Sequence, residues 1–443
     1  MTKKITSIIL AAGKGTRMNS ILPKPLQPIA GKAIISHIID NLYDCAINDV
    51  IVVINNDNDI LKDYLAINYP KIETVVQQSQ KGTGDAVRVV FSKKDLSDSD
   101  GVIVFFGDTP LLKKSTINSL KKASTENDLS ILAFKADNPE GYGRVIVKDG
   151  NLKSIVEDAS TNKESKDIDL CNGGVMALKN NNLKNLLDQL KDNNPKKEFI
   201  LSDMVELINS SNGKTNFIKC NQLEAFGVDT KNGLAKAEKE FQTILRDKFM
   251  SQGVTILDPD TVFFHHDTKI EENVEIQNNV YFGKNVIIKN GVVIRSFSYI
   301  EDSTIHENAT IGPFSRLRGN VTIGHESKIG NFVEIKNSKL ENEVKVSHLS
   351  YIGDASIGEN SNIGAGTITC NFDGKNKNET HIGKDSFIGS NSSLVAPISI
   401  GDHAHVGAGS VVTKDVEDGS LVLTRAPLKT VSNWAKKILG NNR

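Results

Sequence analysis

The fold of the carboxyl-terminal half is decided by residues 270–294, which read IEENVE-IQNNVY-FGKNVI-IKNGVV-I and place an apolar residue at every sixth position. A six-residue period fits neither an α-helix nor a simple alternating strand. It is typical of a solenoid with one short strand per hexapeptide and three strands per coil, the apolar residue pointing inward. Shorter steps, one of them near Leu340, reset the register of the series, whose members are Phe264, Ile270, Ile276, Phe282, Ile288, Ile294, Ile300, Ile305, Ile311, Leu317, Ile323, Ile329, Ile335, Val346, Ile352, Ile357, Ile363, Ile382, Ile388, Leu394, Ile400, Val406 and Val412.

Glycine often follows the apolar residue of a hexapeptide, and we expect glycine or a small polar residue at each corner of the coil. A polar, glycine-rich stretch between Ile363 and Ile382 interrupts the period. We predict that it leaves the solenoid as a loop. Insertions of this kind often bind ligands, and a tolerated surface insertion is the alternative.

The amino-terminal half has a different pattern, in which short apolar runs alternate with helical segments. The runs Ile5–Leu10, Val50–Ile54 and Val102–Phe106 are continuous, as in strands buried on both faces, and residues 33–47 have helical spacing. This alternation predicts a Rossmann-like α/β domain with a mainly parallel sheet and ligands at the carboxyl ends of its strands. The predicted organisation is an α/β domain at 1–231, a helical linker at 232–252, and a left-handed parallel β-helix with a tail at 253–443.

Composition bounds the class of protein. At 443 residues, 38% apolar and 24% charged, the chain is too long for one core and has an ordinary globular composition. A net charge of −1 argues against nucleic acid or a polybasic membrane surface as partner. No apolar stretch reaches the roughly 18 residues that span a bilayer, and the first residues lack an export signal. The four cysteines form no close pair, so we expect a cytoplasmic protein with free thiols.

A glycine-rich turn follows the first predicted strand. Gly13 and Gly15 let backbone N–H groups approach phosphate oxygens, while Arg17 and Lys24 supply positive charge. The turn lacks the third glycine of a dinucleotide fingerprint and the ending of a Walker loop. Taken alone, it could equally be a plain strand–helix turn.

Two later features favour phosphate chemistry. Gln77 follows a strand and precedes Gly82 and Thr83, which open a helix. Asp108 lies at the carboxyl end of the strand 102–106, where a carboxylate can hold Mg²⁺ that bridges phosphates. The alternative for Asp108 is an N-cap of the next helix.

The second half contains a candidate base. An imidazole such as that of His348 can take a proton from an attacking amine near neutral pH, although a packed histidine is the alternative. Arg318 and Lys336 suit a sugar phosphate. Asparagine amides and backbone N–H groups could stabilise an oxyanion.

With these residues, the first half resembles sugar-1-phosphate nucleotidylyltransferases. The whole chain resembles bacterial bifunctional enzymes that are both N-acetylglucosamine-1-phosphate uridyltransferases and glucosamine-1-phosphate acetyltransferases. The resemblance implies acetyl-CoA-dependent N-acetylation of glucosamine-1-phosphate, then Mg²⁺-dependent transfer of uridylate from UTP to N-acetylglucosamine-1-phosphate. The product, UDP-N-acetylglucosamine, supplies peptidoglycan and lipopolysaccharide synthesis. A homotrimer is implied as well.

The resemblance also assigns roles in the first half. Uridine and phosphates would be held by Leu10, Ala11, Ala12, Gly13, Lys24, Gln77, Gly82 and Thr83. The nucleotide–sugar side and the N-acetyl sugar would contact Phe106, Gly107, Asp108, Gly143, Glu157 and Asn172. Asp108 and Asp229 would be the Mg²⁺ ligands. Phe106 stands where the family usually has Tyr. Asp229 stands where the family usually has Asn, and because Asp is also a hard oxygen ligand, we expect metal binding to survive with one added negative charge, although metal affinity could differ.

In the second half, His348 would be the base. Glucosamine-1-phosphate would be held by Arg318, Lys336, Tyr351 and Asn362. Acetyl-CoA would be held by Asn371, Phe372, Lys377, Ser390, Ala408 and Arg425. Phe372 replaces a common Tyr. The apolar tail residues Val431, Trp434, Ile438 and Leu439 predict packing on the solenoid or a neighbouring subunit, with acetyl-CoA between subunits.

Three alternatives remain at this point. The chain could be a single-activity sugar-1-phosphate nucleotidyltransferase whose β-helix serves only for oligomerisation. His381, His403 and His405 could suggest a hexapeptide-repeat carbonic anhydrase, which would leave the first domain unexplained. A binding or structural solenoid with a degenerate front domain is the non-enzymatic alternative.

Overall fold

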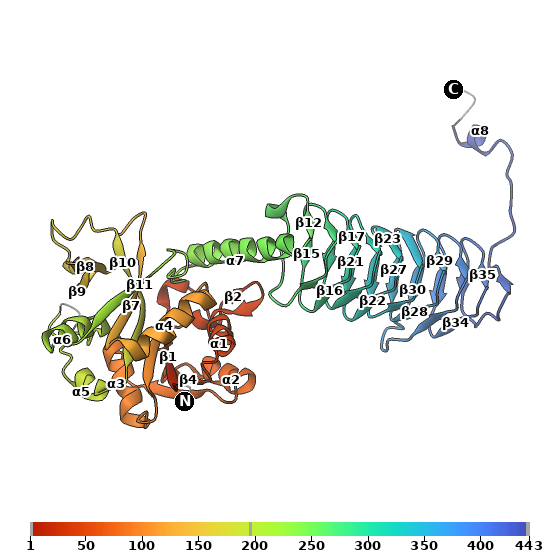
Figure 1. Cartoon of the computed structure of the whole chain (residues 1–443). Helices are drawn as coiled ribbons and strands as arrows, with labels where there is room; N and C mark the ends of the chain where they lie inside the picture. Colours follow the sequence, from red (N-terminus) through yellow and green to blue (C-terminus); the bar gives the residue numbers. More distant parts are fainter. Residues whose placement is uncertain (1–2, 195–196, 440–443) are drawn as a thin grey trace. The chain divides into compact units, whose positions relative to one another are not determined.

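The computed structural model describes residues 3–194 and 197–439 (Figure 1). The chain divides into two compact units, Met1–Phe241 and Gln242–Arg443. The division falls within helix α7, Lys231–Ser251, which covers the segment for which the sequence predicts a linking helix.

The first unit is built on a nine-stranded sheet with the order β11-β7-β10-β6-β1-β4-β5, to which the β8–β9 hairpin is added through β10. Its strands are β1 (Ile5–Leu10), β4 (Asp49–Asn55), β5 (Glu73–Gln77), β6 (Gly101–Phe106), β7 (Leu129–Lys135), β8 (Arg144–Lys148), β9 (Asn151–Val156), β10 (Leu170–Lys179) and β11 (Thr215–Cys220). Strand β1 runs parallel to β4 and β6, β4 to β5, and β7 to β11. The mainly parallel sheet is therefore confirmed, with β10 antiparallel to both β6 and β7.

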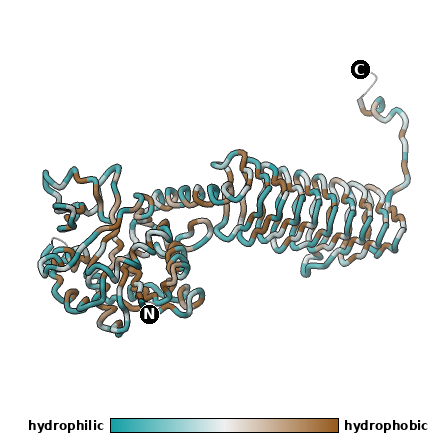
Figure 2. Tube along the Cα trace, viewed as in Figure 1, coloured by the Kyte–Doolittle hydropathy of each residue, from teal (hydrophilic) through white to brown (hydrophobic). Residues whose placement is uncertain are grey.

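Helices cover both faces of this sheet. Successive residues of β1 point to opposite faces, so Ile8 and Ile9 belong to different apolar clusters. Apolar residues of α1, α2 and α4 pack with Ile9, and those of α3, α5 and α6 pack with Ile8, which gives three layers. Figure 2 shows the apolar stretches of this unit in brown. The helices are α1 (Ile34–Asp44), α2 (Asp59–Asn68), α3 (Thr83–Lys93), α4 (Lys114–Glu126), α5 (Leu183–Asp188) and α6 (Met204–Ser210), and a small hairpin joins β2 (Pro28–Ile29) to β3 (Lys32–Ala33).

The second unit is a left-handed parallel β-helix with three sheets of short strands. The first sheet has β12 (Thr255–Ile256), β14 (Glu275–Ile276), β17 (Val293–Ile294), β20 (Thr310–Ile311), β23 (Lys328–Asn331), β26 (Lys345–His348), β29 (Asn362–Ile363), β32 (Phe387–Ile388), β35 (His405–Val406) and β37 (Leu421–Val422). The second has β13 (Lys269–Ile270), β16 (Val286–Ile288), β19 (Ser303–Ile305), β22 (Val321–Ile323), β25 (Lys339–Leu340), β28 (Ala355–Ile357), β31 (Thr380–Ile382) and β34 (Ile398–Ile400). The third has β15 (Tyr281–Phe282), β18 (Tyr299–Ile300), β21 (Arg316–Arg318), β24 (Glu334–Lys336), β27 (Tyr351–Gly353), β30 (Ile368–Cys370), β33 (Ser393–Val395) and β36 (Val411–Val412).

Every apolar residue of the predicted six-residue series is buried, so the solenoid prediction is confirmed. The glycines that follow these residues were expected to form the corners of the coil, but in the structure they mainly allow neighbouring coils to approach closely. A Cβ at Gly330 would lie 1.9 Å from the carbonyl oxygen of Ser347 in the next coil, and one at Gly324 would lie 2.4 Å from the backbone of Glu341. Many left-handed corner positions are instead held by residues such as Asn273 and Phe314. These glycines are therefore required for the close approach of neighbouring coils.

The loop that interrupts the solenoid is shorter than predicted. Strand β30 continues the coil with Thr369 buried, and β31 resumes at Thr380, so residues 371–379 alone leave the wall. The loop is held by its own hydrogen bonds: Asp373 accepts from the backbone N–H groups of Lys375 and Asn376.

The tail continues beyond β37 to the short helix α8, Trp434–Leu439. Among its described side chains, Leu428, Val431, Trp434 and Ile438 are exposed, so this apolar face is not packed on its own solenoid. The side chain of Leu439 lies outside the described residues. Within residues 3–194 and 197–439, no helix combines the length and the apolar character that crossing a bilayer requires.

Candidate active sites

A cleft of about 770 Å³ opens in the first unit at the carboxyl ends of β1, β5 and β6. Among the residues that line it are all but one of those to which the resemblance assigns roles in this half: Leu10, Ala11, Ala12, Gly13, Lys24, Gln77, Gly82, Thr83, Phe106, Gly107, Asp108, Gly143, Glu157 and Asn172. Asp229 is the exception, and it reaches the cleft through a contact with Lys24.

Hydrogen bonds fix the turn that follows β1. The carbonyl oxygen of Ala12 accepts from the side-chain amides of Asn55 (3.2 Å) and Gln80 (2.5 Å), and the N–H of Gly107 donates to Leu10 (2.9 Å). These hydrogen bonds hold the carbonyl groups of Leu10 and Ala12 and so fix the backbone of the turn at the cleft wall. Gln80 was not nominated from the sequence, since it lies in a polar stretch without a motif.

The turn after β5 requires glycine. Gly82 has a φ of 107°, and a Cβ there would lie 2.4 Å from the carbonyl oxygen of Phe199. The side-chain amide of Gln77 donates to the Gly82 carbonyl (3.2 Å) and to Asp85 (2.8 Å). The start of α3 and the end of β5 are therefore joined at the cleft wall.

A cation lies between two carboxylates at the ends of the strands. The Lys24 Nζ is 2.5 Å from Asp108 Oδ2 and 3.0 Å from Asp229 Oδ1, and Arg17 also contacts Asp229 at 3.1 Å. Burial opposes the charge on Lys24, but the two carboxylates raise its pKa above the usual value. Both carboxylates thus converge on one cationic position, and hard oxygen donors in this arrangement fit Mg²⁺.

The N-cap alternative for Asp108 is wrong. Helix α4 begins at Lys114, with Lys113 in the capping position, so Asp108 caps no helix. Its carbonyl oxygen accepts from the N–H of Val228 (2.9 Å), which holds the segment that carries Asp229 beside it.

The other end of the cleft is polar and suits a sugar. The N–H of Asn172 donates to Gly143 (2.7 Å), and the Glu157 carboxylate accepts from the Ser202 hydroxyl (2.8 Å). Next to Ser202, burial together with the charges of Glu206 and Glu157 raises the pKa of Asp203 to about 6. The wall from Glu198 to Ser202 lines the cleft but was missed from the sequence, because no motif marks it.

In the second unit, three adjacent strands bring the nominated phosphate-binding residues together. Arg318 is in register with Lys336, and Glu334 with Tyr351. The guanidinium of Arg318 donates to one Glu334 oxygen from Nε (2.7 Å) and from Nη2 (2.6 Å). Glu334 therefore fixes the direction of Arg318, a role that the sequence analysis did not assign.

His348 is also oriented by a neighbouring coil. It lies opposite Asn331 in the β23–β26 register, and its Nδ1 is 2.6 Å from Asn331 Oδ1. Because an amide oxygen only accepts, the proton lies on Nδ1 and the lone pair of Nε2 is left to act as a base. The two residues are 17 positions apart, which is one coil here. That spacing could have identified Asn331 as the partner.

The loop 371–379 adds further charge near this region. Lys377 lies beside Lys336, whose hydrogen bond and charge lower the pKa of Lys377. The side-chain amide of Asn371 donates to Asp354, another residue that sequence reasoning missed. Phe372 is mostly exposed, and its backbone pairs with that of Lys377.

A column along one corner connects several other nominated residues. Backbone hydrogen bonds between successive coils align His348, Ala365, Ser390 and Ala408. Arg425 lies beyond β37, with its guanidinium near Gly407, next to Ala408.

Asn362 lies apart from this column. It occupies β29, where it pairs with Lys345 of β26 in the preceding coil and with Phe387 of β32 in the following coil.

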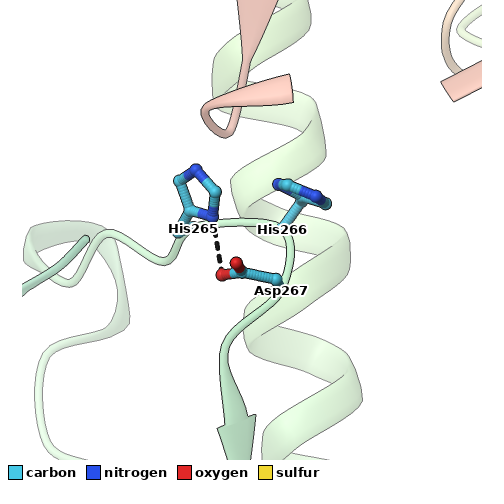
Figure 3. A group of neighbouring side chains, drawn as sticks. All are labelled: His265, His266 and Asp267. Atoms are coloured by element: carbon cyan, nitrogen blue, oxygen red, sulfur yellow. Dashed lines mark hydrogen bonds and ion pairs between the residues drawn. The ribbon is translucent and has the colours of Figure 1, made fainter. Parts of the chain in front are cut away.

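One group of potential metal ligands lies elsewhere in the second unit (Figure 3). It consists of His265, His266 and Asp267, and among the described residues it is the only set of three or more such groups close enough to share an ion. Its carboxylate is already used: Asp267 accepts from His265 Nδ1 at 2.6 Å and from the backbone N–H of Asn285 at 3.1 Å.

The histidines behind the carbonic anhydrase alternative, His381, His403 and His405, form no such group within the described part of the chain.

Comparisons with known families agree with the two kinds of domain. Residues 7–169 match the MobA-like NTP transferase domain. Residues 267–302 match the bacterial transferase hexapeptide (six repeats), 299–372 the GMPPB C-terminal domain, and 379–414 the hexapeptide repeat of succinyl-transferase. A nucleotide-type cleft at the ends of a parallel sheet, joined in one chain to a hexapeptide solenoid, defines a nucleotidyltransferase combined with a hexapeptide acyltransferase.

Curated relatives identify the family. Bifunctional protein GlmU from Wolbachia pipientis wMel is 41% identical over 426 residues, which cover 96% of this chain and 98% of the relative. The proteins of the same name from Paramagnetospirillum magneticum and Zymomonas mobilis are 39% and 41% identical, each over 98% of this chain and 97% of the relative. A crystal structure of HddC from Yersinia pseudotuberculosis has a TM-score of 0.40 at 21% identity, over 53% of this chain and 99% of that one.

The chain belongs to the GlmU family of bifunctional proteins. It is a transferase with two activities in UDP-N-acetylglucosamine synthesis, a uridylyltransferase and an N-acetyltransferase. The single-activity and the non-enzymatic alternatives are therefore set aside.

Proposed function

We propose that the cleft of the first unit binds UTP and N-acetylglucosamine-1-phosphate, and that Asp108 and Asp229 hold the Mg²⁺ that this reaction uses. The observation that carries the proposal is the convergence of both carboxylates on the Lys24 ammonium at the strand ends. When bound, the ion would neutralise phosphate charge. The extra negative charge of Asp229, relative to Asn, is compatible with this role because Lys24 and Arg17 both contact it.

The reaction then needs positioning rather than a side-chain nucleophile. A phosphate oxygen of the sugar-1-phosphate attacks the α-phosphorus of UTP, a new P–O bond forms, and the bond to the leaving pyrophosphate breaks. Lys24 and the backbone N–H groups around Gly13 face the growing negative charge. Glu157 and Asn172, at the polar end, orient the sugar so that its phosphate points along this line.

For the second unit, we place acetyl transfer at the corner that holds His348. Nε2 of His348 takes a proton from the amine of glucosamine-1-phosphate as the nitrogen attacks the acetyl carbonyl of acetyl-CoA. A C–N bond forms, the C–S bond breaks, and the leaving thiolate takes up a proton. Arg318 and Lys336 hold the sugar phosphate, with Tyr351 beside them. The column of Ser390 and Ala408, together with Asn371, Phe372, Lys377 and Arg425, contacts acetyl-CoA.

The hydrogen bond from His348 to Asn331 supports this assignment. A neutral amide fixes the ring and its tautomer without adding charge, as an orienting group does for other catalytic histidines. The steady-state rate of CoA release by Asn331→Ala tests it. We expect a fall in kcat with little change in the KM for glucosamine-1-phosphate. An unchanged kcat would remove Asn331 from the mechanism.

A homotrimer of parallel solenoids in the cytoplasm completes the proposal. Phe297, Phe314 and Phe332 stack along one corner, with ring centroids 4.9 and 5.1 Å apart, and each is about half exposed. Such an apolar ladder is unfavourable in water, so a second and a third copy would cover it, with the exposed tail reaching a neighbour. Light scattering of the full chain tests the trimer. The four free cysteines support the cytoplasmic location.

One assay tests both activities together. The purified chain is incubated with glucosamine-1-phosphate, acetyl-CoA, UTP and Mg²⁺, and the products are identified by mass spectrometry. We expect CoA, pyrophosphate and UDP-N-acetylglucosamine. Formation of UDP-glucosamine in place of the acetylated product would contradict the proposed order of reactions.

A further inference from the structure

A buried carboxylate that the proposed reaction does not use lies at the root of the loop 371–379. Asp354 follows β27 and is only 7% exposed. Its Oδ1 accepts from the side-chain amide of Asn337 at 2.6 Å, and its Oδ2 accepts from that of Asn371. The Lys336 Nζ lies 3.9 Å from the same Oδ2. Asp354 thus contacts two residues nominated for the acetyl-transfer site.

The contact with Asn371 determines which way that amide faces. A carboxylate only accepts hydrogen bonds, so Asn371 must turn its NH₂ group toward Asp354. Its carbonyl oxygen is then directed away from Asp354. An acceptor at this position can receive a hydrogen bond from an amine or amide N–H of a substrate, whereas it cannot donate to an oxyanion.

Asp354 also provides the negative charge between two lysines. Burial opposes ionisation of Asp354, but hydrogen bonds from Asn337 and Asn371 and the charges of Lys336 and Lys377 hold its pKa below the usual value. In turn, Asp354 raises the pKa of Lys377, against the stronger lowering by Lys336, with Tyr351 the other titratable neighbour. Without this anion, two ammonium groups would face each other before any phosphate binds.

We infer that Asp354 is a positioning residue for acetyl transfer: it fixes Asn371 as a hydrogen-bond acceptor and keeps Lys336 and Lys377 together for the phosphates of the two substrates. This inference rests on the proposed acetyl-transfer site. It assigns Asp354 no contact with the reacting atoms.

The solenoid supplies a matched control at the same corner. Asp302 is also left-handed (φ 45°, against 48° for Asp354) and accepts from the side-chain amide of Asn285 at 2.8 Å. Its backbone N–H donates to Lys284 (2.8 Å), as that of Asp354 donates to Lys336 (3.0 Å). Asp302 lies three coils earlier, and none of its hydrogen bonds or ion pairs in the described part of the chain is with a nominated site residue, so it isolates the structural part of the role.

The test compares full-length Asp354→Asn and Asp302→Asn with the unmodified chain, measuring CoA release and UTP-dependent activity. In D354N the new side chain can accept from only one of its two amide donors, so Asn337 or Asn371 must turn over, and the negative charge beside the lysines is lost. We expect kcat/KM for glucosamine-1-phosphate to fall about tenfold or more, as for loss of a charge-assisted hydrogen bond. D302N should stay within about twofold, and uridylyl transfer should be unchanged in both.

A pH profile distinguishes positioning from simple support of the fold. Loss of the Asp354 anion removes a charge that favours protonated Lys377. The rise of the acetyl-CoA KM at alkaline pH should therefore begin at lower pH in D354N and be unaltered in D302N. Asn337→Ala, which removes only the donor to Oδ1, should change the acetyl-transfer KM values in the same direction by a smaller factor.

Equal losses in D354N and D302N, or a normal KM and pH profile in D354N, would overturn the inference while leaving the proposed function intact. An unmodified chain that releases no CoA from acetyl-CoA with glucosamine-1-phosphate would remove the proposed function and this inference together. Light scattering and uridylyl transfer of each variant serve as the check that it is folded.

Discussion

The two sites are built in opposite ways. The cleft of the first unit is assembled from segments far apart in sequence, and Lys24 contacts Asp229, which lies 205 positions later. The site on the solenoid is assembled from residues one coil apart, such as Asn331 and His348. The cleft has walls on several sides, whereas the solenoid site lies on an outer corner, where His348 is among the exposed side chains. A concave site can be complete within one chain, but a convex one gains walls only from a neighbour or a tail.

The largest expected effect tests whether the cleft of the first unit carries out uridylyl transfer without residues of the second unit. Asp108→Ala removes one of the two carboxylates that would hold Mg²⁺ and leaves Lys24 with a single partner. Uridylyl transfer should fall to the assay background, while CoA release stays near normal, because the carboxylate belongs to the first unit alone. Pyrophosphate release and CoA release are measured on the same preparation.

A matched change separates charge from ligation. Asp229→Asn keeps an oxygen ligand and should retain most of the uridylyl transfer. Loss of both activities in D108A would indicate misfolding, and complete inactivity of D229N would argue against its role as a ligand.

The second largest expected effect tests the proposed site on the solenoid. His348→Ala should lower acetyl transfer by about 10²–10⁴-fold, the range for a positioned general base. Activity with UTP and N-acetylglucosamine-1-phosphate should not change. Near-normal CoA release by this variant would return His348 to a structural role.

A third change tests whether the convex site depends on the tail. Deletion after Val422 removes Arg425 and the exposed apolar residues around Trp434. We expect acetyl transfer to fall at least about tenfold through a higher KM for acetyl-CoA, since a partner for its phosphates is lost. Uridylyl transfer is the control. A deleted chain with an unaltered acetyl-CoA KM would show that the tail takes no part.

Much of the fold could be predicted because residues close together in the sequence determine it. The six-residue series predicts which residues enter the solenoid, and the glycine-rich turn predicts the end of β1. The antiparallel insertion of β10 between β6 and β7 was not predicted, because its apolar pattern does not encode direction. Asp354 was overlooked for another reason: its partners depend on coil length, which is 17 residues here.

Contacts across the cleft could not be read from spacing at all. Ser202 meets Glu157 across 45 positions, and only the packed sheet brings them together. The sequence predicted that the glycine-rich turn after β1 would face a site, and its residues line the cleft, whereas the wall from Glu198 to Ser202 was not predicted, since an ordinary polar segment carries no local signal.

The smallest expected effect is on stability. The pKa of Asp203 is about 6, above its ordinary value near 3.8, so the folded state retains a proton that the unfolded chain has lost. The free energy of unfolding should fall as the pH rises from about 4 to 6 and stay lower above that. Asp203→Asn removes this penalty and should stabilise the first unit at pH 7.5 by about 1–2 kcal/mol, a few degrees in Tm.

Calorimetry of both proteins at pH 5 and 7.5 checks this. The advantage of D203N should be smaller at pH 5, where part of Asp203 is already protonated. An equal advantage at both pH values would point to altered packing in place of ionisation.

The glycines of the solenoid place a limit on its evolution. At Gly330 even a methyl group would meet the Ser347 carbonyl at 1.9 Å, one residue before both Asn331 and His348. A substitution there would force the two coils apart and would separate His348, the proposed base, from Asn331, which accepts its hydrogen bond. Exposed positions of the hexapeptides can accept other residues, but Gly330 can be replaced only if the backbone of the neighbouring coil moves as well. The proposed acetyl-transfer site therefore depends on Gly330, although this residue has no functional side chain.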